Sequence, residues 1–327
     1  MLLKPLYPRP KSERLPKRRA VAVCIAAIAG KNTLIGVSDR MLTAGNGDIE
    51  FEPEQGKFWP LSPSIVALIA GDSTVQGELL KQTHKQVKDW IFSDPNSWVN
   101  VKDAASLYCQ KFRELRRERA EAAVLCPLGL DIQSFLANQS TMERELVGQI
   151  ANRLIEWDFP EVLETIFMGI DTDGPVSDKG EKLTYPQIYV TYYDKLLCLN
   201  TVGFAAIGIG KAHADSQFTF TGHWPLKPFD ETLPLAYAAK KRAEAAPGVG
   251  KSTDILVIGP NIAKTVKVED RHLQELDRIY RKSRAASIKA VNVAQKETKS
   301  FVERVNAEKA KPKTSAEPAP STESVKK

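Results

Sequence analysis

The chain has 327 residues, of which 43% are apolar and 26% charged, a balance typical of a protein with a packed core. No run approaches the roughly 18 consecutive apolar residues of a transmembrane helix, so we expect no membrane partner. The net charge is +6, and residues 1–20 account for the excess, with seven basic residues against Glu13. Such a run can contact nucleic acid or anionic lipid, but a solvated leader is the simpler interpretation, and we expect no nucleic-acid partner.

The cysteines and histidines have no spacing that indicates a metal site or a disulfide framework. We therefore expect neither a metal nor another cofactor. Scattered single thiols are typical of a reducing compartment, so we expect a cytoplasmic protein. The four cysteines are Cys24, Cys109, Cys126 and Cys198.

The first elements form a strand-rich set. Residues 1–19 are expected to be a disordered basic leader. The apolar run Val21–Ala29 predicts a buried strand, and Thr33–Val37 predicts its return across a tight turn. Further elements are strands at Ile49–Phe51, Lys57–Leu61 and Ile65–Ala70, and a helix from Ser73 to about Phe92 with Asp72 or Ser73 as N-cap.

Helices come next, and a second strand set follows them. This order of strands, helices, strands and helices favours α+β layers over a doubly wound parallel sheet. The predicted helices are 101–124 and 141–157; the strands are 162–170, 187–192, 196–199 and 204–207; helices 212–220 and 232–246 and a last strand, Asp254–Ile258, complete the set.

The C-terminal region differs in composition from what precedes it. Glu269 to about Lys309 is a charged helical pattern with a broken apolar stripe that could pack on the core or on a partner. Residues 310–327 are rich in Pro, Ser, Lys and Glu, which predicts disorder. We therefore divide the chain into a leader (1–19), a folded domain (20–262), a long charged helix (263–309) and a disordered tail (310–327).

Two glycine-rich segments resemble nucleotide-binding motifs. Ala245–Ser252 fits a relaxed phosphate-loop pattern, but a helix precedes it and a strand follows, the reverse of the required order. Gly208-Ile209-Gly210 has the correct strand-to-helix context but lacks the third glycine of the dinucleotide fingerprint, because His213 stands there. We interpret both segments as structural turns and keep nucleotide binding through Ala245–Ser252 only as a remote alternative.

Three charged residues, Asp39, Arg40 and Lys57, stand at the ends of two early strands. By spacing alone they could be a solvated strand edge or an ordinary surface ion pair worth under about 1 kcal/mol. A family resemblance gives them another interpretation.

Five segments follow one another over residues 20–260 and carry a family resemblance together. They are Val21–Ala29 with Ser38-Asp39-Arg40; Lys57 with Ala70-Gly71-Asp72; Gly169-Ile170-Asp171 with Gly174-Pro175; Gly203 to Gly210; and Ala239-Lys240-Lys241 with Gly250 and the strand Asp254–Ile258. In this order they resemble a proteasome subunit, and the opening strand resembles that of bacterial proteasome-like proteins. The helix 141–157 resembles an insertion relative to a standard subunit.

The resemblance implies the N-terminal-nucleophile (Ntn) hydrolase fold, a four-layer αββα sandwich. In the active family an N-terminal threonine hydroxyl attacks an amide bond, and its own α-amine accepts the proton. A lysine ammonium held by an aspartate stabilises the developing negative charge. Asp39 matches that aspartate, Lys57 matches the lysine, and Arg40 matches the basic residue that commonly follows the aspartate.

The chain departs from this pattern at the nucleophile. The threonine would fall at Ala22 or Val23, and Cys24 lies one or two positions too far along a buried strand. About 20 residues also precede the strand, so a free α-amine would require cleavage. Ile209 replaces the serine of the family's Gly-Ser-Gly turn, and the later aspartate and serine fall at Ala246 or Pro247 and at Val249.

Two functions remain open from the sequence. One is a threonine-type peptidase or amidohydrolase, self-processed or cleaved, that acts on a peptide or protein. The other is a non-catalytic structural subunit of an oligomeric ring. Either implies a homo-oligomer, as a ring or stacked rings, with the helices at 73–92 and 141–157 as candidate contact surfaces.

Overall fold

The computed structural model describes most of the chain, which divides after Leu276 into two units that we treat separately. The first unit carries all the strands, and the second is the greater part of one helix, α7 (Asp270–Ala310). The described residues are 22–44, 49–54, 56–94, 98–160, 162–172, 184–259 and 264–310. The predicted leader, the tail beyond 310 and the Gly174-Pro175 segment of the resemblance lie outside them.

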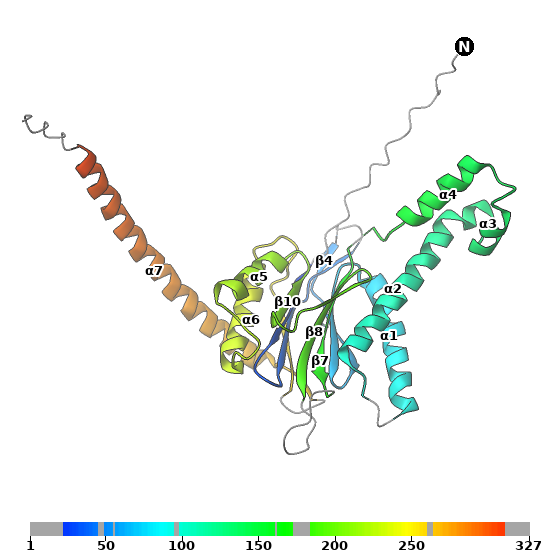
Figure 1. The fold of residues 1–327 in the computed structure, drawn as a ribbon. Helices are drawn as coiled ribbons and strands as arrows, with labels where there is room; N and C mark the ends of the chain where they lie inside the picture. Colours follow the sequence, from blue (N-terminus) through cyan, green and yellow to red (C-terminus); the bar gives the residue numbers. More distant parts are fainter. Residues whose placement is uncertain are drawn as a thin grey trace, which may run out of the picture. The chain divides into compact units, whose positions relative to one another are not determined.

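Two five-stranded antiparallel sheets form the centre of the first unit (Figure 1). The first sheet has the order β10-β1-β2-β11-β12, and the second has the order β5-β6-β7-β8-β9. The strands of the first are β1 (Cys24–Ile28), β2 (Leu34–Asp39), β10 (Phe204–Ile207), β11 (Thr253–Ile258) and β12 (Thr265–Lys267). Those of the second are β5 (Phe58–Ser62), β6 (Ile65–Ala70), β7 (Glu164–Asp171), β8 (Tyr185–Tyr192) and β9 (Lys195–Cys198). A separate hairpin joins β3 (Leu42–Ala44) and β4 (Ile49–Phe51).

The two sheets pack face to face through a buried apolar layer. Strand side chains alternate between faces, so every second residue from Ala22, which precedes β1, to Ile28 at its end enters this layer. The sheets approach closely where Met168 lies over Gly36, because a Cβ on Gly36 would stand 2.6 Å from the Met168 methyl carbon. Burial of each larger aliphatic side chain in the layer, such as Ile28 or Leu34, contributes roughly 1.5–3 kcal/mol, so this layer is a main source of stability.

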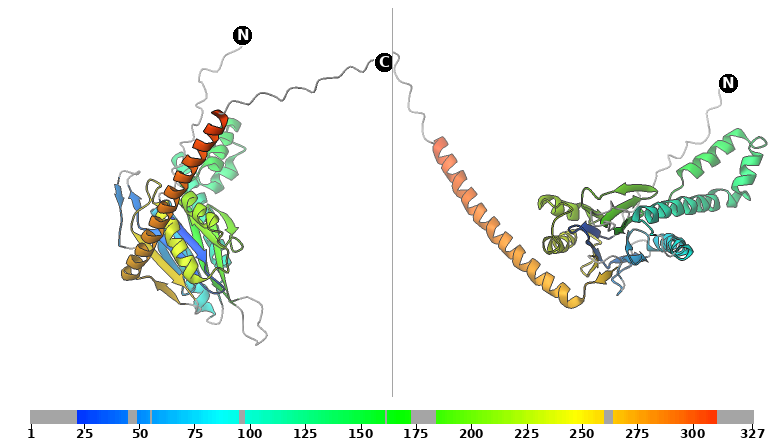
Figure 2. Two further views of the ribbon diagram at one scale, coloured as in Figure 1. Left: turned by 90° about the vertical axis from the view of Figure 1, so that its left-hand side faces the viewer. Right: turned by 60° about the horizontal axis from the view of Figure 1, so that its bottom comes forward.

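Helices cover the outer face of each sheet, which completes an αββα arrangement (Figures 1 and 2). The predicted fold class is therefore confirmed at the level of α+β layers. On the second sheet lie α1 (Ser73–Ser93) and α2 (Val101–Val124); on the first lie α5 (Lys211–Phe220) and α6 (Phe229–Ala243).

Beyond α2 the chain forms a small helical extension with its own apolar cluster. Helix α4 (Arg144–Glu156) falls within the predicted helix, whereas α3 (Ile132–Asn138) was not predicted. The N-terminus of α3 is fixed by a capping box, in which Asp131 and Ser134 bond each other's backbone N–H. The cluster consists of Val124, Leu125, Phe135 and Ile150 with partly buried neighbours.

No single helix in the described ranges combines the length and apolar composition of a membrane span. One bent pair, Val101–Leu128 with Ile132–Asn138, meets those criteria by length and composition only.

Candidate functional site

Asp39, the last residue of β2, is the centre of a fully buried polar cluster. Its side chain is 0% exposed and accepts three hydrogen bonds from separate parts of the chain. Oδ1 accepts the Lys57 ammonium at 2.7 Å and the Val23 N–H at 3.0 Å, and Oδ2 accepts the Gly250 N–H at 2.8 Å. The carboxylate therefore joins the start of β1, the approach to β5 and the loop after α6.

Lys57 lies immediately before β5, and only 5% of its side chain is exposed. Removing an ammonium and a carboxylate from water costs several kcal/mol per ion, which close pairing and further hydrogen bonds must offset. The 2.7 Å contact and the two backbone donors on Asp39 supply that compensation. The structure thus brings together Asp39 and Lys57, as the family resemblance implied and the sequence spacing alone did not.

Arg40 belongs to a different pair. Its guanidinium forms two hydrogen bonds with Asp254 of β11, from Nε to Oδ2 at 2.9 Å and from Nη2 to Oδ1 at 2.7 Å. Lys267 also reaches Asp254 Oδ1, at 3.0 Å. Burial by itself raises the pKa of the Asp254 carboxyl, but the hydrogen bonds and charges of Arg40 and Lys267 outweigh burial and lower it.

This lowered pKa predicts an acid-dependent loss of stability. The contribution of Asp254 is complete above the carboxyl's unfolded pKa of about 3.9 and is lost as pH falls through the lower folded value. Asp254→Asn should cost about 3 kcal/mol near pH 7, because Arg40 loses its charged partner. Urea unfolding of the wild type and of Asp254→Asn between about pH 6 and 3 should show that the difference in their free energies of unfolding narrows below about pH 4. A gap independent of pH would contradict the assignment.

The expected nucleophile position carries no hydroxyl or thiol. Ala22 and Val23 are both 0% exposed, and backbone hydrogen bonds fix them on both sides. The Ala22 carbonyl accepts the Gly210 N–H at 3.2 Å, and the Val23 carbonyl accepts the Asp39 N–H at 3.1 Å. The start of β1 is therefore an integrated part of the first sheet, with aliphatic side chains beside the Asp39–Lys57 pair.

Cys24 is the nearest chemical nucleophile in the sequence, and its environment makes it inert. It is 0% exposed, and its Sγ donates to the Ile69 carbonyl at 3.2 Å. Burial raises the pKa of the Cys24 thiol to about 12, although the Lys57 ammonium acts in the opposite direction. At neutral pH the thiol stays protonated, and a protonated thiol is a poor nucleophile.

The Gly208-Ile209-Gly210 turn packs against the start of β1, as its interpretation as a structural turn predicted. Gly208 has a φ of +82°, and a Cβ there would lie 2.3 Å from the Ala22 carbonyl oxygen. Its N–H donates to Glu164 Oε2 at 2.5 Å. Sequence reasoning missed Glu164; the only signal was an acidic residue at the beginning of an apolar strand.

A cavity of about 320 Å³ adjoins the turn, lined by Val162, Glu164, Gly208, Ile209, Lys211, Ala212 and Asp215.

Polar backbone groups of the loop 245–252 are hydrogen-bonded to side chains from other parts of the chain. The Gly250 N–H bonds Asp39, while the carbonyls of Gly250 and Lys251 each accept the buried Lys240 ammonium at 2.9 Å. Ser252 donates its N–H to Glu52 at 3.2 Å. Helix α6 precedes the loop and β11 follows it, so a phosphate would meet neither a helix N-terminus nor free amides at Gly250 and Ser252.

Within the described residues, no group of three or more His, Cys, Asp or Glu side chains is arranged to hold a metal ion.

Comparison with known proteins gives no family for this chain. No protein-family model matches it, and no curated protein matches it. On these findings the chain is an α+β protein whose described residues form two five-stranded antiparallel sheets and seven α-helices.

Proposed function

We propose that the chain is a proteasome-subunit-like protein of the Ntn-hydrolase type that acts as a non-catalytic, structural subunit of a homo-oligomer. The αββα layer order and the five resembling segments support the scaffold. The buried contact between Asp39 and Lys57 supports the match of these two residues to the family's aspartate and lysine.

The observation that carries the non-catalytic assignment is the start of β1. In a threonine-type hydrolase a free hydroxyl and a free α-amine must lie beside the lysine. Here the residues beside the pair are Ala22 and Val23, and the Val23 N–H is a peptide donor to Asp39. With its oxygens bonded to Lys57, Val23 and Gly250, Asp39 cross-links three segments of the first unit.

The hydrolase remains the second candidate because threonine-type amide hydrolysis also requires a lysine ammonium held by an aspartate, and Asp39 holds Lys57 in this way. It would act on a peptide or protein and would require cleavage that exposes a new Thr, Ser or Cys. For either role we place the protein in the cytoplasm, in keeping with four cysteines that are all free.

The helical extension after α2 is the assembly surface we favour. It exposes large apolar side chains on α3 and α4, including Leu136 at 59% and Ile155 at 73%. Large exposed apolar patches mark protein–protein contacts, and we propose that these side chains contribute to one. Light scattering of the wild type should give a mass above that of one chain. Replacing Ile155 with Asp should lower this mass. A monomeric wild type at micromolar concentration would count against assembly.

Intact mass, N-terminal sequencing and thiol labelling of the purified protein test the proposal. We expect an unprocessed chain that does not react with a peptide epoxyketone. Iodoacetamide should label the exposed Cys126 and Cys198 but spare the buried Cys24 and Cys109 until denaturant is added. A new N-terminus at Thr, Ser or Cys that reacts with the epoxyketone would replace the structural assignment with the hydrolase.

A further inference from the structure

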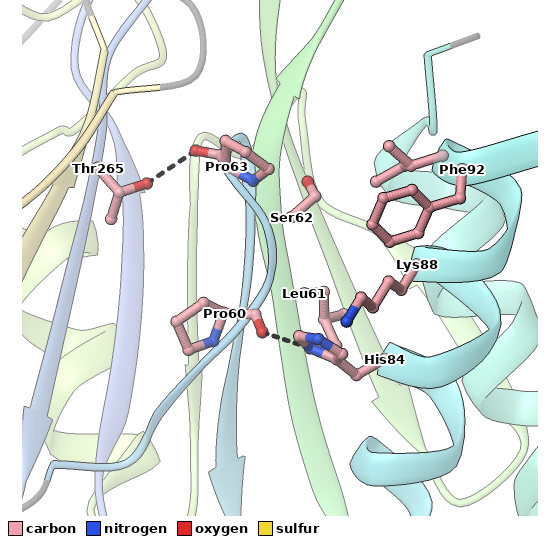
Figure 3. A pocket seen from close by; sticks show the side chains of 9 residues that line it. Pro60, Leu61, Ser62, Pro63, His84, Lys88, Phe92 and Thr265 are labelled. Atoms are coloured by element: carbon pink, nitrogen blue, oxygen red, sulfur yellow. Dashed lines mark hydrogen bonds between the residues drawn. The ribbon is translucent and has the colours of Figure 1, made fainter. Parts of the chain in front are cut away.

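A cavity of about 650 Å³ lies between the C-terminal half of α1 and the edge strand β5 (Figure 3). This volume falls within the range of about 300–1,000 Å³ that is usual for small-molecule sites. No member of the Asp39–Lys57 pair lines it. The lining residues are Pro60, Leu61, Ser62, Pro63, His84, Lys88, Ile91, Phe92 and Thr265.

The cavity walls are built from regular structure. His84, Lys88, Ile91 and Phe92 follow the spacing i, i+4, i+7 and i+8, so one face of α1 supplies all four. Opposite this face, the Thr265 hydroxyl of β12 donates to the Pro63 carbonyl at 3.1 Å. This bond joins β12, at the edge of the first sheet, to the turn between β5 and β6 of the second sheet, and both contribute to the cavity (Figure 3).

Most of the lining is apolar. The rings of Pro60, Pro63 and Phe92, together with Ile91, offer hydrocarbon contact. Phe92 is 70% exposed, so covering its ring with an apolar ligand would remove further surface from water. This part of the cavity suits a hydrocarbon chain or ring.

Two of the polar side chains at the cavity, His84 and Lys88, are basic, and Ser62 and Thr265 add hydroxyls. His84 Nδ1 lies 3.0 Å from the Pro60 carbonyl, which can only accept, so Nδ1 carries the proton and Nε2 is left for another contact. The Lys88 ammonium lies 5.5 Å from the centre of the Phe92 ring. Among the described residues neither forms a salt bridge, and no carboxylate lines the cavity.

We propose that this cavity binds an amphipathic monocarboxylate. Its hydrocarbon body would lie against Ile91 and Phe92, and its carboxylate would meet the Lys88 ammonium. An ammonium of the same shape would be repelled by Lys88. A neutral molecule would gain the apolar contact alone. Charge-assisted pairing is the feature that selects the acid.

Titration calorimetry of the full-length protein with octanoate and octanamide tests the site, because the two probes differ only in the charged head group. Octanoate should bind saturably at one site per chain, and octanamide should bind about tenfold more weakly. Ligand-observed NMR should show saturation transfer to the octanoate methylene protons. Equal affinities for the two probes, or no saturable octanoate binding below its micellar limit, would overturn the proposal.

Variants of α1 separate the two parts of the site. Lys88→Ala should remove about tenfold of the octanoate affinity and leave octanamide binding unchanged. Lys85→Ala is the matched control, since this lysine lies on the same helix outside the lining. Phe92→Ala should weaken both probes alike. Lys88 and Phe92 are exposed, so each variant should fold, as circular dichroism would verify.

A second copy of the chain is the rival occupant of this face. If Phe92→Arg lowers the assembly mass measured by light scattering, the face is an oligomer contact and the carboxylate site is wrong. An unchanged mass, with octanoate affinity lost, supports the site. The mass, N-terminal sequencing and epoxyketone experiments on the proposed function do not depend on this outcome, so failure here leaves the proposed function standing.

Discussion

Replacing Asp39 with alanine is expected to lower the free energy of unfolding by about 3–5 kcal/mol, because the buried Lys57 ammonium loses its counter-charge. The Val23 and Gly250 N–H groups would also lose their acceptor. Each buried donor left without a partner adds a desolvation cost of about 1–3 kcal/mol, so the upper part of the range is the better estimate. Guanidinium unfolding at pH 7 measures the loss.

Glu114→Ala is the matched control for this experiment. It removes the carboxylate of the Lys111–Glu114 pair, whose side chains are 22% and 42% exposed. An exposed pair three residues apart on a helix contributes only about 0.2–0.5 kcal/mol. If Asp39→Ala is too unstable to purify, Asp39→Asn keeps an acceptor and should give a smaller loss in the same direction.

The outcome bears directly on the role of the pair. A large loss supports Asp39 as a cross-link of β1, β2 and the loop after α6. If Asp39→Ala unfolds at the same denaturant concentration as Glu114→Ala, the pair does not hold the scaffold together, and the cross-linking role of Asp39 is wrong.

Gly208→Ala is the second change with a large expected effect, a loss of more than about 3 kcal/mol. A φ of +82° costs an L-residue about 1–2 kcal/mol by itself. The added Cβ would also stand 2.3 Å from the Ala22 carbonyl oxygen, which is backbone and cannot move aside alone. The turn or the start of β1 must therefore shift.

Gly222 separates these two causes. It has a φ of +60°, but a Cβ there meets no atom within 4 Å. Gly222→Ala should therefore cost only the conformational part, about 1–2 kcal/mol. Melting temperatures of both variants give the comparison, and equal losses would mean that the close approach of Gly208 to Ala22 is not a real constraint.

The sequence predicted the layers well because each buried strand carries a run of apolar residues. β10 (Phe204–Ile207) and β6 (Ile65–Ala70) have the predicted bounds. It missed α3, which is short, and β12, which has three residues and only one apolar side chain. β12 forms because it pairs with β11, and the pairing of two strands cannot be predicted from the local sequence pattern of either.

The site shows the same division between local pattern and distant contact. The resemblance selected Asp39 and Lys57 and indicated Ala22 or Val23 at the nucleophile position. It grouped Arg40 with them, whereas the structure pairs Arg40 with Asp254, more than 200 positions along the chain. No spacing rule reaches over such a separation, because the register of β2 against β11 decides which side chains meet.

By itself, the sequence determined the α+β layers and the absence of a nucleophilic side chain at Ala22 and Val23. Only the tertiary structure decided that the Asp39 carboxylate accepts hydrogen bonds from Lys57 and from two backbone N–H groups. The physical reason is that side-chain identity is a local property, whereas burial and hydrogen bonding depend on which distant segments pack together.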